Sequence, residues 1–335
     1  MEKIRFGILG CGTIGDVHAR ALLSSELGEL YAVCDANEKR AIEYGEKYGV
    51  KTYSSYEKML LDEKVDAVAI CTPSGMHKDQ AILALENGKH VLLEKPMALT
   101  SEDAMKIREA EKKAGKVLSI IFQMRFTDDV RRLKKLIDDG AFGTLTFCDL
   151  YMKYWRDPSY FTVSPWRGTF AMDGGGALMN QGIHGVDIMH YLCGAPRLLS
   201  ARVKTLVHKI ETEDTAAALV EYPSGAVGVI EASTSSNPGF ERRVEINGSR
   251  GYAVIVDSHL EKLYIDGESL LEKTVVTTGA SASDPTKMTH ENHLLQYENF
   301  IRAIRGEEEL VSSSNDGYLA VKFIEDIYKK SKEYN

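Results

Sequence analysis

The sequence has little of what defines several large classes of protein. Its five cysteines are scattered and form no CxxC pair, which excludes a disulfide framework and a zinc ribbon and suits a reducing compartment. No apolar run approaches the roughly 18 residues that a membrane helix needs. The net charge is −8 with both signs interspersed, so there is no basic face for nucleic acid. No targeting segment precedes the first predicted strand, and we expect a soluble, cytoplasmic protein without a membrane or nucleic-acid partner.

The first third of the chain alternates short apolar runs with helical segments. The 335 residues are long for one core, so two domains are expected. The runs are continuous and rich in β-branched residues, as in strands that are buried on both faces of a parallel sheet. Predicted strands lie at 4–10, 30–35, 65–73, 89–96 and 116–123, and predicted helices at 14–26, 37–48, 56–63, 76–87 and 101–113. We therefore predict an α/β domain at residues 1–123.

After residue 124 longer strands follow one another with tight turns between them. The turns "YPSGAV" and "INGSRGY" carry the Pro, Ser, Asn and Gly signals of hairpins. Two helices, at about 289–305 and 315–331, close the chain. We predict that residues 124–335 form an α+β domain around a large, open, mostly antiparallel sheet, with a last helix that can pack back on the first domain.

A glycine-rich turn follows the first strand. Gly10, Gly12 and Gly15 stand in a GxGxxG arrangement between that strand and a helix. The first glycine permits a tight turn, the second lets the backbone approach a pyrophosphate, and the third allows close packing of helix on strand. The pyrophosphate would lie on the helix N-terminus, at Thr13 and Ile14, where free N–H groups favour anions. The first domain is thus predicted to be a Rossmann dinucleotide-binding domain.

An acidic residue ends the next strand. Asp35 lies about 20 residues beyond the last glycine, the spacing at which a carboxylate accepts bonds from a ribose. It would repel the 2′-phosphate of NADP, although Lys39 and Arg40 follow closely and could soften that repulsion. We expect NAD as the cofactor rather than NADP.

The stretch "LLEKPM" places Glu94, Lys95 and Pro96 at the carboxyl end of the fourth predicted strand. Ligands bind at that edge of open α/β sheets. A partly buried lysine there can relay a proton, because burial readily shifts its pKa. A solvated lysine, or a Glu94–Lys95 surface pair, is an equally open interpretation at this point.

The stretch "DGGGALMNQGIHGVD" reads as a helix that opens with three glycines. Asp173 is the predicted N-cap of a helix that begins at Gly174. Asn180, His184, Asp187 and Tyr191 then fall on one polar face, and Asp187 is a candidate to orient the imidazole. The glycines would let the backbone lie against another surface, such as a cofactor ring. On these grounds alone, a structural histidine explains His184 as well as a catalytic one does.

Four motifs in this order resemble the glucose–fructose oxidoreductase and inositol dehydrogenase (Gfo/Idh/MocA) family: "GILGCGTIG", "AICTPSGMH", "LLEKP" and "GGGALMNQGIHGVD". The resemblance covers essentially the whole chain. It implies a nicotinamide-dependent oxidoreductase that acts on a sugar, polyol or related hydroxyl compound, with Lys95 and His184 beside the reacting carbon. It also implies a cis Lys95–Pro96 bond. The residues that it implies around the cofactor and the substrate mouth are Thr72, Pro73, His77, Glu94, Trp166 and Arg167.

The predicted mechanism has His184 take the alcohol proton, with Lys95 hydrogen-bonded to the same oxygen; the two could exchange roles. Asn180 stands where inositol dehydrogenase-like members have an aspartate, and it is predicted to bind substrate hydroxyls. Arg125 is a candidate ligand for an anionic or hydroxylated substrate. The residues do not decide between a free sugar, a polyol and a sugar nucleotide. The alternative function is a ligand sensor that binds NAD(P) without chemistry.

The stretch "HENH" has two histidines, His290 and His293, three residues apart. No cysteine or third ligand stands near them in the sequence, so we expect solvent-facing residues and no metal. Exposed sheets pair in similar proteins, and the chain is expected to form a homodimer or homotetramer around a small-molecule substrate.

Overall fold

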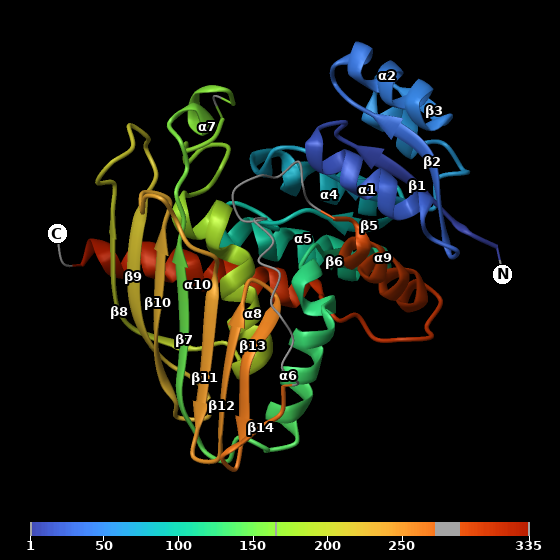
Figure 1. Cartoon of the computed structure of the whole chain (residues 1–335). Helices are drawn as coiled ribbons and strands as arrows, with labels where there is room; N and C mark the ends of the chain where they lie inside the picture. The colour runs from blue at the N-terminus through green and yellow to red at the C-terminus, as the bar shows by residue number, and fades with distance from the viewer. Residues whose placement is uncertain (1, 165, 272–288, 334–335) are drawn as a thin grey trace. The chain divides into compact units, whose positions relative to one another are not determined.

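The computed structural model describes residues 2–164, 166–271 and 289–333 (Figure 1). The chain divides into two compact units. Unit 1 comprises Met1–Gln123 and Thr286–Tyr318, and unit 2 comprises Met124–Pro285 and Leu319–Asn335. The prediction of one second domain at residues 124–335 differs from this division in one respect, because the described residues 289–318 belong with the first unit.

Unit 1 is built on a parallel sheet with the strand order β3-β2-β1-β4-β5-β6. Its strands are β1 (Ile4–Leu9), β2 (Gly28–Cys34), β3 (Lys51–Tyr53), β4 (Ala67–Ile70), β5 (His90–Leu93) and β6 (Leu118–Ile120). Its helices are α1 (Thr13–Leu23), α2 (Glu38–Tyr48), α3 (Tyr56–Leu60), η1 (Ser74–Met76), α4 (His77–Glu86), α5 (Ser101–Ala114) and α9 (Glu291–Ile304). The order is that of a Rossmann sheet, as predicted. Strand β3 was not predicted, since three residues carry no periodic signal.

The core of unit 1 includes residues from the end of the chain. Phe6 on β1 is fully buried, and its ring meets that of Tyr297 edge to face with the centroids 5.1 Å apart. Phe300 and Ile301, also on α9, are fully buried in the same cluster. Burial of such side chains contributes about 1.5–3 kcal/mol each. Helix α9 is thus part of the hydrophobic core of the first unit.

Unit 2 contains an eight-stranded sheet with the order β14-β13-β12-β11-β7-β10-β9-β8. Only β7 and β10 pair in parallel among its described strands, and the mostly antiparallel prediction is confirmed. The strands are β7 (Leu145–Lys153), β8 (Arg197–Lys204), β9 (Thr215–Glu221), β10 (Val227–Ser233), β11 (Arg243–Gly248), β12 (Gly251–Val256), β13 (His259–Ile265) and β14 (Glu268–Ser269). The helical segments are η2 (Gln123–Phe126), α6 (Asp128–Asp138), α7 (Ser159–Thr162), η3 (Ala177–Gly182), α8 (Ile183–Cys193) and α10 (Ser314–Lys332), which begins in unit 1.

The two faces of the large sheet differ. Leu150 and Met152 on β7 are fully buried, and they pack where Gly185 of α8 leaves room for them. On the other face Phe147 is 51% exposed and Leu219 is 44% exposed.

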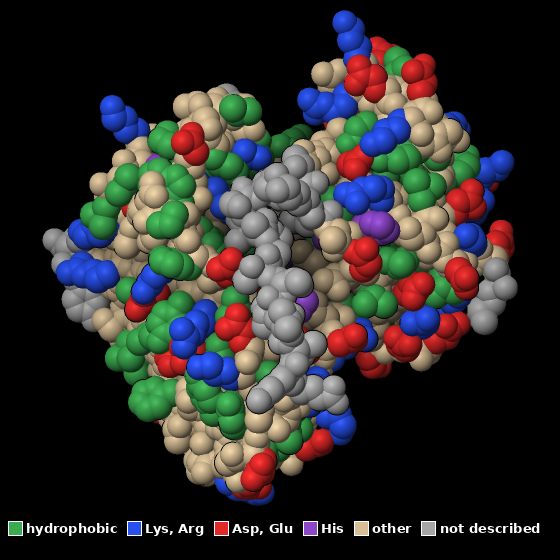
Figure 2. Space-filling model, in the orientation of Figure 1, with side chains coloured by type: hydrophobic (Ala, Val, Ile, Leu, Met, Phe, Trp, Pro, Cys, Tyr) green, Lys and Arg blue, Asp and Glu red, His purple; other side chains and the backbone are tan. Residues whose placement is uncertain are grey.

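No helix in the described part of the chain is long and apolar enough to span a membrane. Acidic and basic side chains are intermixed over the face of the molecule shown in Figure 2.

Candidate active site

The three glycines of the first turn have different surroundings. Gly10 has a positive φ of 101°, and a Cβ there would lie 2.7 Å from the carbonyl oxygen of Cys71. A Cβ on Gly15 would lie 2.2 Å from the carbonyl oxygen of Gly10. Around Gly12, in contrast, no described atom comes within 4 Å of the Cβ position. Gly10 and Gly15 therefore shape the turn, and Gly12 leaves open space for a ligand to approach the backbone.

Helix α1 begins at this open point. Gly12 is its N-cap residue, and no side chain of the described residues caps it. The Tyr44 hydroxyl donates a hydrogen bond to the Gly12 carbonyl at 2.5 Å, which fixes the loop from the side of α2. The N–H groups of the first turn remain available to an anion. This geometry fits a dinucleotide, whose pyrophosphate Gly12, Thr13 and Ile14 would hold.

Asp35 follows β2 and is 8% exposed. Its carboxylate accepts hydrogen bonds from the Cys11 N–H at 2.9 Å and the Asn37 N–H at 2.8 Å. A guanidinium nitrogen of Arg40 lies 3.6 Å from the same carboxylate. The remaining lone pairs can still accept bonds from ribose hydroxyls.

His77 was predicted to line the cofactor cleft, which stays a prediction, and the structure shows that its ring joins two backbone segments. The side chain is 1% exposed, and its ring nitrogens lie 2.7 Å from the Pro96 carbonyl and 2.9 Å from the Thr72 carbonyl. Burial lowers the pKa of this imidazole. His77 thus joins the backbone after β4 to the backbone after β5. Thr72 and Pro73 are half-buried at that edge, and their contact with the cofactor stays a prediction.

Lys95 comes two residues after β5 and is half-buried. The Lys95–Pro96 bond is cis, as the resemblance implied. Glu94 is buried, with one oxygen accepting from the Lys95 N–H at 3.1 Å and the other 3.1 Å from His18 Nε2. Burial raises the pKa of Glu94, but the bond from His18 and neighbouring charges outweigh it and lower the pKa to about 2. This carboxylate fixes the Lys95 backbone, and its place beside the cofactor stays a prediction.

The glycine-rich helix of unit 2 begins later than predicted. A π-helical turn, η3, starts at Ala177 with Gly176 as its N-cap and continues into α8. Asp173 is not the cap: its carboxylate accepts from the Gly168 N–H at 2.8 Å and from the Asn180 amide. The predicted N-cap therefore positions the side chain of Asn180 instead.

Glu213 caps this helix from outside its local sequence. Its carboxylate accepts hydrogen bonds from the N–H of Gly176 at 3.0 Å and of Leu178 at 2.7 Å, and the Tyr328 hydroxyl donates to it at 3.0 Å. Burial raises the pKa of this carboxyl. Sequence reasoning missed Glu213; the available signal was an acidic pair, with Asp214, directly before an alternating strand.

The glycines of this helix start serve unit 2 itself. A Cβ on Gly175 would lie 2.1 Å from the Tyr328 hydroxyl, and one on Gly176 would lie 2.0 Å from the Glu213 carbonyl oxygen. Both positions are too close for any side chain. We predicted that these glycines leave space for a cofactor ring. The structure shows that the space beside Gly175 and Gly176 is filled by Tyr328 and Glu213.

The predicted polar face is divided between two environments. Asn180 and His184 are half-buried, whereas Asp187 is 1% exposed. Asp187 pairs with Arg125, which is 3% exposed, through Nη2 at 2.6 Å and Nε at 3.0 Å. The Arg125 guanidinium also lies over the Tyr191 ring, 4.8 Å from its centroid. The structure thus places Arg125 and Asp187 in a buried ion pair; that Arg125 binds substrate and that Asp187 orients His184 stay predictions.

The loop before this helix is joined to it by polar contacts. Arg167 lies over the Tyr160 ring at 4.0 Å and donates to the Tyr160 carbonyl at 3.1 Å. The Gln181 amide donates to the Tyr160 hydroxyl at 2.8 Å, and Arg156 donates to the Gln181 side-chain oxygen at 2.7 Å. The loop is thereby linked to the neighbour of Asn180. Cofactor contacts of Trp166 and Arg167 stay predictions.

A parallel sheet of this order, with an open glycine turn at a helix start, defines the dinucleotide-binding class of α/β proteins. A family described as "Oxidoreductase family, NAD-binding Rossmann fold" matches residues 4–122, and the GFO/IDH/MocA C-terminal domain matches residues 130–254. The chain belongs to the Gfo/Idh/MocA family of oxidoreductases, and its cofactor is NAD.

Known relatives span nearly the whole chain. Myo-inositol 2-dehydrogenase of Thermotoga maritima is 29% identical over 95% of this chain and 93% of its own. The scyllo-inositol 2-dehydrogenase (NAD(+)) of Bacillus subtilis is 30% identical over 91% of this chain and 87% of its own. The WlbA dehydrogenase of Bordetella pertussis, solved in complex with NADH and UDP-GlcNAcA, has a TM-score of 0.87 at 29% identity and covers 100% of this chain and 98% of its own.

Proposed function

We propose that the protein is an NAD-dependent dehydrogenase or reductase that acts on a CH–OH carbon of a sugar, polyol or sugar derivative. The observation that carries the proposal is Lys95, which lies at the same edge of the parallel sheet as the open glycine turn. Its backbone is fixed by the Glu94 carboxylate, and His77 fixes the next residue. Bound NAD would supply the hydride acceptor or donor for the reacting carbon.

The proposed chemistry of the side chains is proton transfer at the substrate oxygen. His184 accepts the hydroxyl proton during oxidation, and Lys95 donates a hydrogen bond to the same oxygen and can exchange roles with His184. Asn180 binds a substrate hydroxyl, and its amide is oriented by Asp173. Because an amide does not raise the basicity of His184 as a carboxylate would, an inositol substrate is not favoured over other sugars.

The substrate class follows from relatives that act on inositols and from one solved with UDP-GlcNAcA. We include nucleotide-linked sugars for that reason. The direct test follows NADH formation from NAD across polyols, aldoses, inositols and sugar nucleotides. Lys95→Ala and His184→Ala are each expected to lower kcat by about 10²–10⁴-fold, the range of general acid–base contributions.

The matched control for Lys95 is Lys106→Ala, because Lys106 is a surface lysine of α5 whose side chain is 48% exposed. It should retain wild-type turnover. Near wild-type kcat in both Lys95→Ala and His184→Ala would refute the mechanism. A silent panel with tight NADH binding would instead favour the non-catalytic ligand sensor.

The proposal extends to assembly. We infer a homodimer or homotetramer that forms through the open face of the large sheet. Phe147 and Val227 are opposite each other in the β7–β10 register, and Leu219 is opposite Val229 in the β9–β10 register, so apolar side chains lie together on that face. Light scattering should give a dimer or larger, and Phe147→Glu should shift the mass toward the monomer. A monomeric wild type would contradict the inference.

A further inference from the structure

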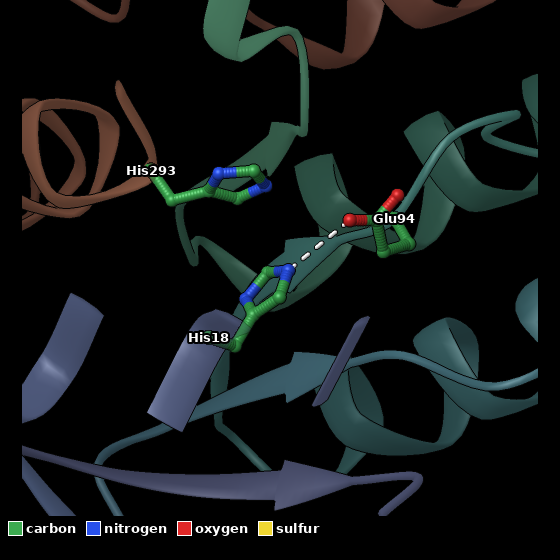
Figure 3. Close-up of side chains that lie close together, drawn as sticks. All are labelled: His18, Glu94 and His293. Atoms are coloured by element: carbon green, nitrogen blue, oxygen red, sulfur yellow. Dashed lines mark hydrogen bonds and ion pairs between the residues drawn. The ribbon is translucent and has the colours of Figure 1, made fainter. Parts of the chain in front are cut away.

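Three buried side chains with metal-binding atoms meet inside unit 1. They are His18 on α1, Glu94 after β5 and His293 on α9, and one ligand atom of each lies within 4.8 Å of the other two. Figure 3 shows the two imidazoles and the carboxylate turned toward one another. No third ligand stands near His293 in the sequence, which led us to expect a solvent-facing side chain. The structure corrects this, since His293 is 1% exposed.

Hydrogen bonds do not account for the burial of the His293 side chain. Neither of its ring nitrogens has a hydrogen-bond partner among the described residues. A buried polar group without a partner costs about 1–3 kcal/mol. A neutral imidazole has one ring nitrogen with a lone pair to offer. A bound cation is one group that would use that lone pair.

The other two members are arranged as metal ligands commonly are. His18 Nδ1 lies 2.8 Å from the Tyr297 hydroxyl, so the tyrosine holds the ring with Nε2 toward Glu94. Histidine ligands are typically fixed in this way through their second nitrogen. Glu94 is also held, because its other oxygen accepts from the Lys95 N–H. Each of these two groups is thus held by a contact through an atom that does not face the site, and a metal ion would take the place of the proton in the hydrogen bond between His18 Nε2 and Glu94 Oε1.

We propose that His18, Glu94 and His293 bind one divalent transition-metal ion, with Zn²⁺ as the expected occupant. Two imidazoles and a carboxylate suit zinc rather than calcium or magnesium. Metal–ligand bonds of 2.0–2.2 Å place tetrahedral donors about 3.3 Å apart. The 3.1 Å between His18 Nε2 and Glu94 Oε1 meets this requirement. The ring of His293 has to move closer to the pair to complete the site, because the three ligand atoms lie within 4.8 Å of one another rather than within about 3.3 Å.

An ion here would have a structural consequence. It would connect α1, the end of β5 and α9, which come from the beginning, middle and end of unit 1's sequence. It would also hold Glu94, the residue that fixes the backbone of Lys95. This site does not depend on the proposed reaction, because its occupancy can be measured without any substrate.

The test uses the full-length protein. It is treated with a chelator, dialysed against Zn²⁺ and then against metal-free buffer, and its zinc content is measured by mass spectrometry. We expect about one zinc per chain in the wild type. His293→Ala and His293→Gln should each lose at least about nine-tenths of that zinc, and Co²⁺ bound in its place should give the visible absorption of a tetrahedral site in the wild type only.

The matched control is His290→Ala. His290 belongs to the same HENH stretch but contacts Ser24 and Arg20, not the cluster. It should retain one zinc. NADH binding shows that each variant's first unit is folded. A wild type that binds no zinc, or a folded His293→Gln that binds as much as the wild type, would overturn the proposal.

Discussion

The helical segments α1 and η3 each start directly after a glycine, and the two starts have opposite surroundings. At α1, Gly12 has open space beside it and the first-turn N–H groups have no capping side chain among the described residues. At η3, the same kind of space is filled by the Glu213 carboxylate and the Tyr328 hydroxyl. The comparison teaches that glycines before a helix let another group approach the backbone closely. The surrounding atoms show whether that group belongs to a ligand or to the protein itself.

The two units can be followed separately. Both tryptophans of the chain, Trp155 and Trp166, lie in unit 2, so intrinsic tryptophan fluorescence reports the unfolding of that unit. NADH binding to the isolated enzyme reports the integrity of unit 1. The predictions below use this separation, because a change at one helix start should move one signal and leave the other.

The largest effect is expected at the buried ion pair beneath the second helix. Asp187→Ala leaves the Arg125 guanidinium in a buried site without this carboxylate, and loss of one partner of such a pair costs about 3–5 kcal/mol. The urea midpoint of tryptophan fluorescence should fall. The exposed pair Arg197–Glu221 gives the control, since Glu221→Gln should cost less than about 1 kcal/mol. Equal effects of the two variants would contradict the assignment of a structural role.

Replacing Gly176 and Gly12 by alanine, one at a time, tests the comparison of the two helix starts directly. Gly176→Ala places a Cβ 2.0 Å from the Glu213 carbonyl and should destabilise unit 2 by about 1–3 kcal/mol while NADH affinity is kept. Gly12→Ala meets no described atom, so it should leave the fold intact and weaken NADH binding, because the methyl group occupies the ligand's space. Fluorescence-detected unfolding and NADH titration give both readings. If Gly12→Ala bound NADH as tightly as the wild type, the open space would not be the pyrophosphate site.

Glu213→Gln should have a smaller effect of the same kind. The amide keeps one acceptor oxygen, so one of the N–H groups of Gly176 and Leu178 loses its partner, at about 1 kcal/mol or more. We expect a lower kcat and a lower urea midpoint for unit 2, with unchanged NADH affinity. Glu211→Gln, two residues away and exposed, is the control. A variant with wild-type kcat would show that the cap does not position Asn180 or His184.

The smallest effect concerns pH and unit 1. Burial lowers the pKa of His90 to about 4, where its Nδ1 accepts from the Val117 N–H. The unfolded chain takes up this proton near pH 6.5, before the folded one does. Stability is therefore complete above about pH 6.5 and falls toward pH 4. The urea concentration that abolishes NADH binding should drop over this range, and less steeply in His90→Asn, whose oxygen replaces Nδ1. If this urea concentration fell equally steeply with pH in the wild type and in His90→Asn, His90 would not be the cause of the pH dependence.

Sequence reasoning succeeded where the determinants are local. The Rossmann sheet and the large antiparallel sheet were predicted from apolar runs, turn residues and the order of segments along the chain, whereas the cis bond at Lys95 was implied by the family resemblance. The roles of Gly10 and Gly15 were also predicted, because a βα turn of that length has few solutions. The family resemblance extended this to the whole chain.

The failures share one physical reason, which is partners that are distant in sequence. Asp173 was predicted to cap the helix, but the residue that caps it is Glu213, which is 37 residues from Gly176 in the sequence. The ion pair of Arg125 was not predicted, because its partner Asp187 is 62 residues away. His293 looked exposed because its neighbours His18 and Glu94 lie in other segments. The periodicity of apolar residues does not indicate which residues far apart in the sequence contact each other.

Helix α9 has a consequence for how the protein is made. The core around Phe6 needs Tyr297, Phe300 and Ile301, which leave the ribosome long after the strands they cover. A growing chain therefore holds an unfinished first sheet with uncovered apolar surface while the second sheet is completed. Truncation at residue 123 would yield a fragment that lacks part of its own interior. We expect prematurely terminated chains to aggregate more readily than the full-length chain, because this apolar surface stays uncovered until α9 has been made.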